Sequence, residues 1–263
     1  LVASNGRKLD ARFESYCDLI DGSGIVPKLR AVKSEEELLF VTKAGEISDE
    51  AFLAAKPLIK AGADEGEILS AMQGTVFALG GDYPGNEFII GSGRDALLCR
   101  YKSGRSKLDA NDQLTLEWSG AWRRYHAPMM RTVLTGKPQK RHLELYEAAA
   151  EALTAVESAM IADNTFGDVF EAHRAVMDKH GLMRHRLNAC GYSVGATFTP
   201  SWMDMPMFFE DNPEPIVANM SLFAHMIIMD SDTDCAMTLG RTYITGDGPP
   251  RSLSTLELDL VIA

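Results

Sequence analysis

The first third of the chain has apolar residues spaced for helices. Ser34 and Glu37 form a capping box, and the apolar positions that follow predict a long amphipathic helix over 34–58. A second helix is predicted over 64–79, where Asp64 stands at the N-cap position. These two segments predict a pair of consecutive helices before the first strands.

The rest of the chain repeats this order. Two more helices are predicted over 139–161 and 166–180, and Gly181 suits the position just after the second of them. Strand-like patterns lie at 88–99 (two short apolar runs around a Gly-rich turn), 114–136 (a hairpin), 221–229 and 235–245. Helix, helix and strands, followed by helix, helix and strands, predict an α+β fold made of two similar halves.

Composition limits the kinds of partner. The chain has 263 residues, of which 46% are apolar, so it can bury the core of one large domain. Its formal charge of −11 disfavours nucleic acid and anionic membranes as partners. A small molecule is the expected partner.

The spacing of the cysteines and the length of the apolar runs indicate the cellular location that we expect. The four cysteines show neither a C-x-x-C pair nor disulfide-dense spacing, as is usual in a reducing cytoplasm. No basic-then-apolar leader opens the chain, and no apolar run approaches the ~18 residues of a membrane span. We therefore expect a cytoplasmic protein, and the absence of an initial Met suggests a missing upstream segment.

The hairpin segment 114–136, LTLEWSGAWRRYHAPMMRTVLTG, resembles the β-hairpin of the pita-bread family, which includes methionine aminopeptidase, aminopeptidase P, prolidase and creatinase. Other anchors of the resemblance are LRAVKSEEE at 29–37, Ser92-Gly93, Gly191 with Gly195, and YITGDG at 243–248. The resemblance implies two αα-plus-antiparallel-β pseudo-repeats around a curved sheet. It also implies a catalytic domain over 31–263, with residues 1–30 as the remnant of an upstream N-terminal domain and its linker.

Metallopeptidases of this family hold two metal ions with five side chains. The resemblance places Glu117 and Pro128 at the two Asp positions, Tyr192 at the His position, and His225 and Leu239 at the two Glu positions. Proline and leucine side chains have no donor atom, and a dinuclear site needs bridging carboxylates. We therefore expect no metal cofactor.

Within the family, the metal-free ectoine hydrolases are most similar to this chain. The similar features are a Glu-Trp strand, a Tyr-His-x-x-Met-Met-Arg-Thr strand and an Arg before the hairpin. Creatinases, also metal-free, have a His where Arg100 stands and a Glu where Met130 stands. The resemblance implies hydrolysis of a C–N bond in ectoine, a small cyclic amidine, to N-acetyl-diaminobutyrate.

Ectoine is a zwitterion, so its pocket needs a fixed cation and a fixed anion. Arg100 can bind the carboxylate bidentately, and Glu117 can face the amidinium. Strand periodicity places His126 and Met130 on the same side as Pro128. The predicted site residues are Glu117, His225 and His126 as catalytic groups, and Arg100, Tyr192 and Met130 as substrate-binding groups.

Structural explanations compete with several of these assignments. Arg100 could be a surface arginine near a turn, and His126 and His225 could be buried histidines with one hydrogen bond each. The acidic residues Asp230, Asp232 and Asp234 lack the Gly and Glu of a calcium loop, which favours a solvated turn.

Other functions also stay open. The alternatives are a creatinase-like amidinohydrolase, a non-catalytic homologue used for binding, and a metallo-aminopeptidase or prolidase. The resemblance further implies a homodimer whose pockets are completed by the neighbouring subunit.

Overall fold

The computed structural model describes residues 3–99 and 105–263. The predicted first helix pair is confirmed as α3 (Glu35–Ala55) and α4 (Glu65–Ala78), with a short 3₁₀ turn, η1 (Lys56–Leu58), after α3. Both bonds of the Ser34 capping box form, and the Asp64 carboxylate accepts a bond from the amide of Gly66. The caps that the sequence shows therefore set where both helices begin.

The strands of the first half are β1 (Ile89–Ser92), β2 (Asp112–Trp122) and β3 (Tyr125–Thr135). The predicted second short strand within 88–99 is wrong, because residues 93–97 form the 3₁₀ helix η2 (Gly93–Leu97). Gly93 adopts φ +55°, and its amide donates to the Asp112 carboxylate at 2.8 Å. This bond turns the chain away from the line of β1.

The second half repeats the order of the first. Helices α5 (Lys140–Ala159) and α6 (Phe166–Lys179) are confirmed, and Gly181 has φ +70° just after α6. The strands of this half are β4 (Ala189–Ser193), β5 (Asp204–Phe209), β6 (Ser221–Asp230) and β7 (Cys235–Ile244), with two short additions, β8 (Arg251–Ser252) and β9 (Val261–Ile262).

The strands form one sheet in the order β1-β2-β3-β7-β6-β4-β5, in which neighbouring strands run antiparallel. The pairing of β3 with β7 joins the two halves. One line of directly paired residues, here called the inner row, crosses the sheet: Ile89, Glu117, Met130, Gly240 and His225. Because directly paired residues share a face, the register brings Glu117 and His225 to the same face from different halves.

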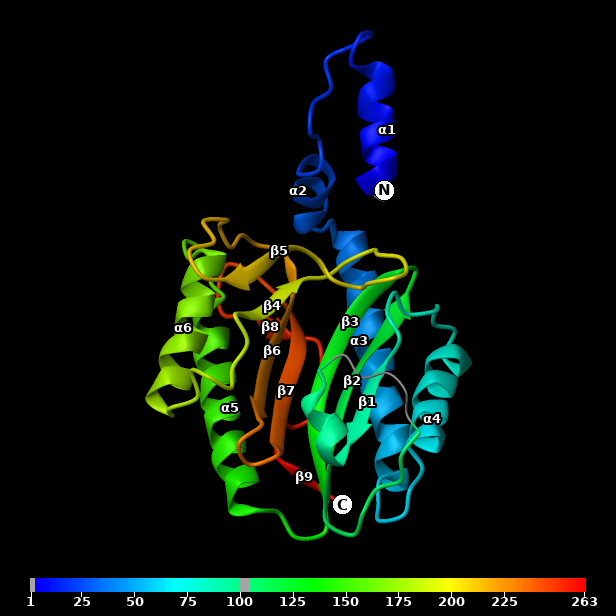
Figure 1. The fold of residues 1–263 in the computed structure, drawn as a ribbon, viewed down its shortest axis with the longest axis vertical. Helices are drawn as coiled ribbons and strands as arrows, with labels where there is room; N and C mark the ends of the chain where they lie inside the picture. The colour runs from blue at the N-terminus through cyan, green and yellow to red at the C-terminus, as the bar shows by residue number, and fades with distance from the viewer. Residues whose placement is uncertain (1–2, 100–104) are drawn as a thin grey trace.

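The helices cover the opposite face of the sheet. Figure 1 shows α3 and α4 beside the strands of the first half, and α5 and α6 beside those of the second. The Trp118 ring stacks on Phe52 of α3 at 5.2 Å, and a Cβ added at Gly120 would lie 2.1 Å from the carbonyl oxygen of Ala44. Because side chains alternate along a strand, burying Trp118 under α3 turns Glu117 to the uncovered face.

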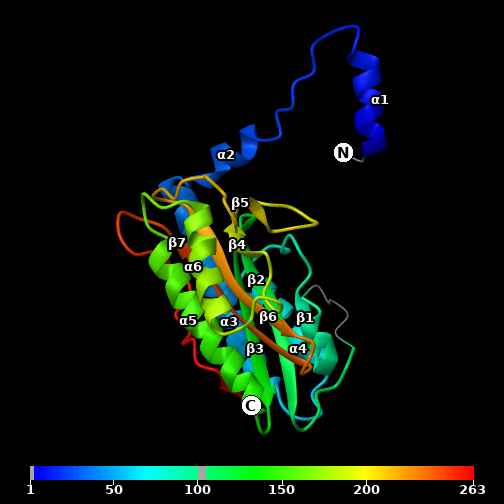
Figure 2. The same cartoon turned by 60° about the vertical axis from the view of Figure 1, so that its left-hand side comes forward.

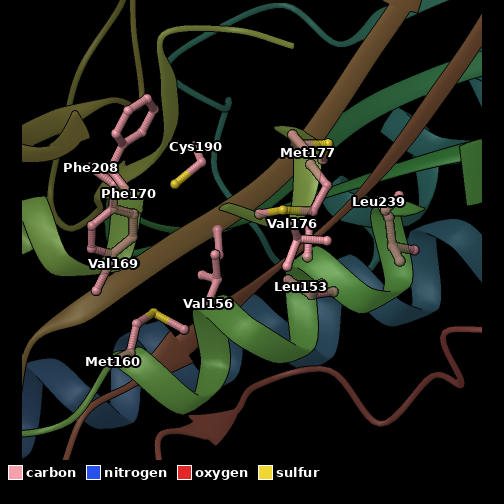
Figure 3. Packing of buried hydrophobic residues seen from close by; sticks show 14 of the residues in the cluster. Leu153, Val156, Met160, Val169, Phe170, Val176, Met177, Cys190, Phe208 and Leu239 are labelled. Carbon is pink, nitrogen blue, oxygen red and sulfur yellow. The ribbon is translucent and has the colours of Figure 1, made fainter. Parts of the chain in front are cut away.

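Helices α5 and α6 lie beside the strands of the second half (Figure 2), and their buried residues form a second core with residues of β6 and β7. Figure 3 shows Leu239 of β7 packed in this core with residues of α5 and α6, including Leu153 and Met177. Leu239 therefore points away from His225, whose neighbour on β7 is Gly240. The side chain at the position that the resemblance assigns to the last Glu ligand lies in the helix-side core.

The N-terminal segment extends away from this body. Helix α1 (Ala3–Phe13) has no buried residue and stands apart in both views, whereas α2 (Ile25–Ala31) lies at the upper edge of the sheet (Figures 1 and 2). The sequence did not predict α1. Within the described ranges, none of the helices has the length and apolar character that a membrane span requires.

Candidate active site

A small cavity opens on the uncovered face of the sheet, at the level of the inner row. Its volume is about 100 Å³, and strands of both halves contribute to its lining. Glu117 comes from β2, Tyr192 from β4 and His225 from β6. The segment before β5 adds Trp202 and Met203 to the lining. The structure therefore brings three of the six predicted site residues, Glu117, Tyr192 and His225, around one cavity.

Glu117 is 9% exposed and has a defined partner. The hydroxyl of Tyr192 donates to Glu117 Oε1 at 3.3 Å, and the indole Nε1 of Trp202 donates to the Tyr192 oxygen at 2.9 Å. A carboxylate at this depth needs such bonds to offset the loss of hydration. Glu117 is therefore a shielded carboxylate with a hydrogen-bond partner, and not a strand-end carboxylate in solvent.

His225 lies across the cavity from β2 and is 6% exposed. Its ring is tilted against Tyr192, with the ring centroids 5.6 Å apart, and against Phe223 at 5.4 Å. The cavity thus holds one carboxylate and one imidazole on an aromatic base. Such a pair can divide the roles of nucleophile or base and of proton carrier between two side chains.

His126 is placed differently. It lies on the same face of the sheet as Glu117, as its pairing with Ala121 requires, but it is fully buried and does not line the cavity. Its Nε2 accepts from the amide of Gly85 at 2.8 Å, and its Nδ1 lies 3.1 Å from the Thr197 hydroxyl. Burial lowers the pKa of His126 to about 4, so the ring is neutral near pH 7.

The two other predicted residues also lie outside the lining. Met130 is on the inner row, but it is fully buried and packs into the core between Glu117 and Gly240. Arg100 lies outside the described residues, so its role in substrate binding stays a prediction of the resemblance.

The donor groups present do not fit a dinuclear metal site. Pro128 and Leu239 offer no donor, and the Leu239 side chain lies on the helix side of the sheet. A Cβ added at Gly240 would lie 2.7 Å from the Ala224 carbonyl oxygen, so the position beside His225 leaves no space for a substitute ligand. Of the five ligand positions, Glu117, Tyr192 and His225 carry a donor atom, and only one of these is a carboxylate, whereas two ions need bridging carboxylates and further ligands.

Among the described residues, one group of three side chains with metal-ligand chemistry occurs, and it lies away from the cavity. Asp230 and Asp232 flank His185 at 3.7 and 3.8 Å. The interpretation of Asp230 as part of a solvated turn is wrong, because Asp230 is 1% exposed and binds Arg141 at 2.7 Å. Burial of a charged group required this partner, which the local sequence does not reveal.

The sequence did not identify Trp202. This residue stands just before β5, between Pro200 and Pro206, in a stretch too short to show helix or strand periodicity. The single Trp in this loop could have indicated a buried hydrogen bond, because a buried indole N–H usually has an acceptor. Met203 and Met207 add apolar surface to the lining of the cavity.

The chain belongs to metallopeptidase family M24, whose model matches residues 40–244. It is 28% identical over 208 residues to the ectoine hydrolase of Halomonas elongata, an alignment that covers 75% of this chain and 51% of that protein. It is also 25% identical over 171 residues to the Xaa-Pro dipeptidase of Pyrococcus furiosus, covering 65% of this chain and 49% of that protein. The chain spans about half the length of these curated relatives.

Solved structures share the fold. The X-Pro aminopeptidase of Thermotoga maritima matches all of this chain and 72% of its own, with a TM-score of 0.89 at 20% identity. The prolidase of Pyrococcus furiosus matches 89% of this chain and 68% of its own, with a TM-score of 0.83 at 21% identity. These likenesses confirm the predicted pita-bread architecture.

Proposed function

We propose that this chain hydrolyses a C–N bond of a small cyclic amidine, with ectoine as the substrate, and that it does so without the two metal ions of the metallopeptidases. The observation that carries the proposal is that Glu117 and His225 line the same small cavity. The resemblance equates both positions with metal-ligand positions of the family. The similarity to an ectoine hydrolase supports the same substrate.

An amidinium suits a site of this kind. Its charge is spread over two nitrogens, so the carbon between them is already electrophilic. Glu117 provides the negative charge that faces this group, and a carboxylate held by hydrogen bonds at a buried site is a defined partner for it. A peptide carbonyl has no such built-in activation, and in this family its hydrolysis relies on the metal ions.

The reaction adds one water to the ring. Either Glu117 attacks the amidine carbon and water then displaces it, or Glu117 takes a proton from a water that attacks. In both cases the water oxygen ends on that carbon as the amide oxygen, one C–N bond breaks, and the departing nitrogen gains a proton. His225 lines the same cavity and is the group we assign to deliver that proton.

The size of the cavity favours a compact ligand. Its volume of about 100 Å³ is far below the ~300–1,000 Å³ of pockets that take drug-sized molecules. Trp202, Met203 and Met207 line it with apolar surface. A single small ring fits this description better than an extended dipeptide.

Arg100 completes the proposal at the other end of the substrate. The resemblance assigns it to the ectoine carboxylate, and a guanidinium can bind a carboxylate with two parallel bonds. A homodimer with shared pockets and a cytoplasmic location belong to the same proposal.

The test is a melting-temperature screen followed by product analysis. Ectoine should raise the melting temperature in a concentration-dependent way, and proton NMR should show N-acetyl-diaminobutyrate forming. Creatine and an Xaa-Pro dipeptide serve as the matched comparison ligands. Stabilisation and turnover with either of these, and none with ectoine, would refute the proposed substrate.

A further inference from the structure

We propose that Trp202 is a positioning residue that fixes the direction of a hydrogen-bond relay, Trp202 to Tyr192 to Glu117, and thereby commits Glu117 to act as nucleophile or base and not as the acid. The inference rests on the proposed function, because the state of Glu117 matters only if it reacts with the substrate. It supplies a structural reason why Glu117, and not His225, is the group that attacks or takes a proton.

The relay consists of two hydrogen bonds between three buried side chains. Trp202 is 1% exposed and donates its Nε1–H to the Tyr192 oxygen at 2.9 Å. Tyr192 is 3% exposed and donates to Glu117 Oε1 at 3.3 Å. Water has little access to the tryptophan and the tyrosine, so the protein supplies the partners of both groups.

The direction of the relay follows from the chemistry of its first member. An indole nitrogen can only donate, whereas a phenol has one hydrogen to donate and lone pairs to accept. Because the Tyr192 oxygen accepts from Trp202, its single hydrogen is directed to Glu117. An ionised carboxylate accepts such a bond at either oxygen, and a charge-assisted bond is the stronger one. The relay therefore stabilises the charged form of Glu117.

This direction divides the two reactive side chains. A group held as an acceptor is suited to attack carbon or to take a proton from water, and it is a poor source of the proton that the departing nitrogen needs. That proton then comes from His225, the imidazole that lines the same cavity.

Close packing of the backbone around Gly85 and Ser201 keeps Trp202 in position to donate to Tyr192. A Cβ added at Gly85 would lie 2.8 Å from the carbonyl oxygen of Ser201, so the two backbone segments are packed closely. Gly85 in turn donates to Nε2 of His126, whose ring centroid lies 6.5 Å from that of Trp202. His126 thus fixes the segment against which Trp202 packs.

The relay can be tested in the protein without substrate, by the indole N–H signals in nitrogen-15 NMR spectra. Tyr192→Phe removes one hydroxyl, so the Trp202 signal should move and its N–H should exchange faster with water. Glu117→Gln should move it in the same direction but less, because a weaker terminal acceptor weakens each bond in the chain. The Trp118 indole, which donates to the Ser48 carbonyl at 2.9 Å, is the matched control and should not change. If the Trp202 N–H signal keeps its position and its exchange rate in either variant, the proposal is wrong.

The consequence for turnover is tested by a double-mutant cycle with ectoine. Trp202→Phe keeps an aromatic ring and should lower kcat about 10-fold with a smaller change in KM, because a donor that orients the reacting group is lost. In the Tyr192→Phe background the same substitution should change kcat less than about 2-fold, since the relay is already broken. Independent, multiplicative losses would overturn the positioning role.

The two experiments separate failure of the inference from failure of the proposed function. If the NMR test shows the relay and neither wild type nor variant hydrolyses ectoine, the proposed substrate is wrong while the relay stands. If wild type hydrolyses ectoine and the Trp202 signal does not respond to Tyr192→Phe, the substrate stands and the relay is wrong. Melting curves of each variant confirm that it is folded at the assay temperature.

Discussion

Two histidines on the same face of the sheet lie in opposite surroundings. His225 lines the cavity together with Glu117 and Tyr192. His126 lies where the 81–86 and 195–197 segments pack over β3, and hydrogen bonds engage both of its ring nitrogens. Strand periodicity predicted the side of His126, the resemblance placed His225 at a ligand position, and both rings lie on the uncovered face of the sheet. The face of the sheet follows from the strand, but the loops that pack over that face determine whether a side chain reaches the cavity.

The comparison shows that one face of the sheet carries a histidine that lines the cavity and another that stabilises the surrounding loops. The ring of His126 is neutral at pH 7 and holds two segments in place, one of which packs against Trp202. The ring of His225 contacts the rings of Tyr192 and Phe223 and lines the cavity. Substitutions should therefore separate the two histidines, with losses of turnover at His225 and losses of stability at His126.

The largest effect should follow from removing the charge of Glu117. Glu117→Gln keeps the size of the side chain and an acceptor oxygen for Tyr192, but removes the nucleophile or base. Turnover of ectoine should fall at least ~100-fold, because positioned acid–base groups contribute that much or more. Steady-state kinetics measure it, and a loss smaller than ~10-fold would refute the role.

The next effect sharpens the contrast between the histidines. His225→Gln should lower kcat about 100-fold with little loss of stability, because it removes the proton donor. His126→Gln should leave kcat per folded molecule within about 3-fold of wild type. Kinetics normalised to the folded fraction from circular dichroism measure both. Equal losses of kcat in the two variants would show that the contrast is wrong.

The pH dependence of stability probes the buried ring. Folding lowers the pKa of His126 from 6.5 to about 4, so between these values the unfolded chain binds a proton that the folded chain does not. The stabilisation is complete above pH 6.5 and is lost as the pH falls toward 4, by up to about 3 kcal/mol from this group. His173, whose pKa burial also lowers to about 4, adds a change of the same sign.

Urea unfolding at pH 7.5 and pH 4.5 measures this loss. The difference in unfolding free energy between the two pH values should be smaller in His126→Gln than in wild type. An unchanged difference in His126→Gln would contradict the role of burial.

The smallest effect should come from removing metal ions. Because Pro128 and Leu239 offer no ligand, dialysis against a chelator should change ectoine turnover less than about 2-fold. Elemental analysis before and after dialysis serves as the control for metal content. If dialysis lowers turnover strongly and added Mn²⁺ or Co²⁺ restores it, the chain uses metal ions as the metallopeptidases do.

Much of this protein could be predicted from local sequence. Ser34, Asp64 and Gly181 mark helix ends through bonds that form within a few residues, and the alternation in β3 put His126 and Met130 on one face of the sheet. The resemblance added the equivalence of Glu117, Tyr192 and His225, which the register of five strands brings together. These features depend on short-range bonds or on a family pattern, so the order of residues suffices.

Only the tertiary structure decided the rest. It placed Trp202 beside Tyr192, gave His126 its partners on two loops, turned Leu239 into the helix-side core and paired Asp230 with Arg141. Apart from the Trp202–Tyr192 bond, which joins residues ten positions apart, each depends on contacts between segments far apart in the chain. Strand order and close packing bring these segments together, and no local pattern does. The sequence determined which groups are available for chemistry, and the packing of its loops determined which of them reach the cavity.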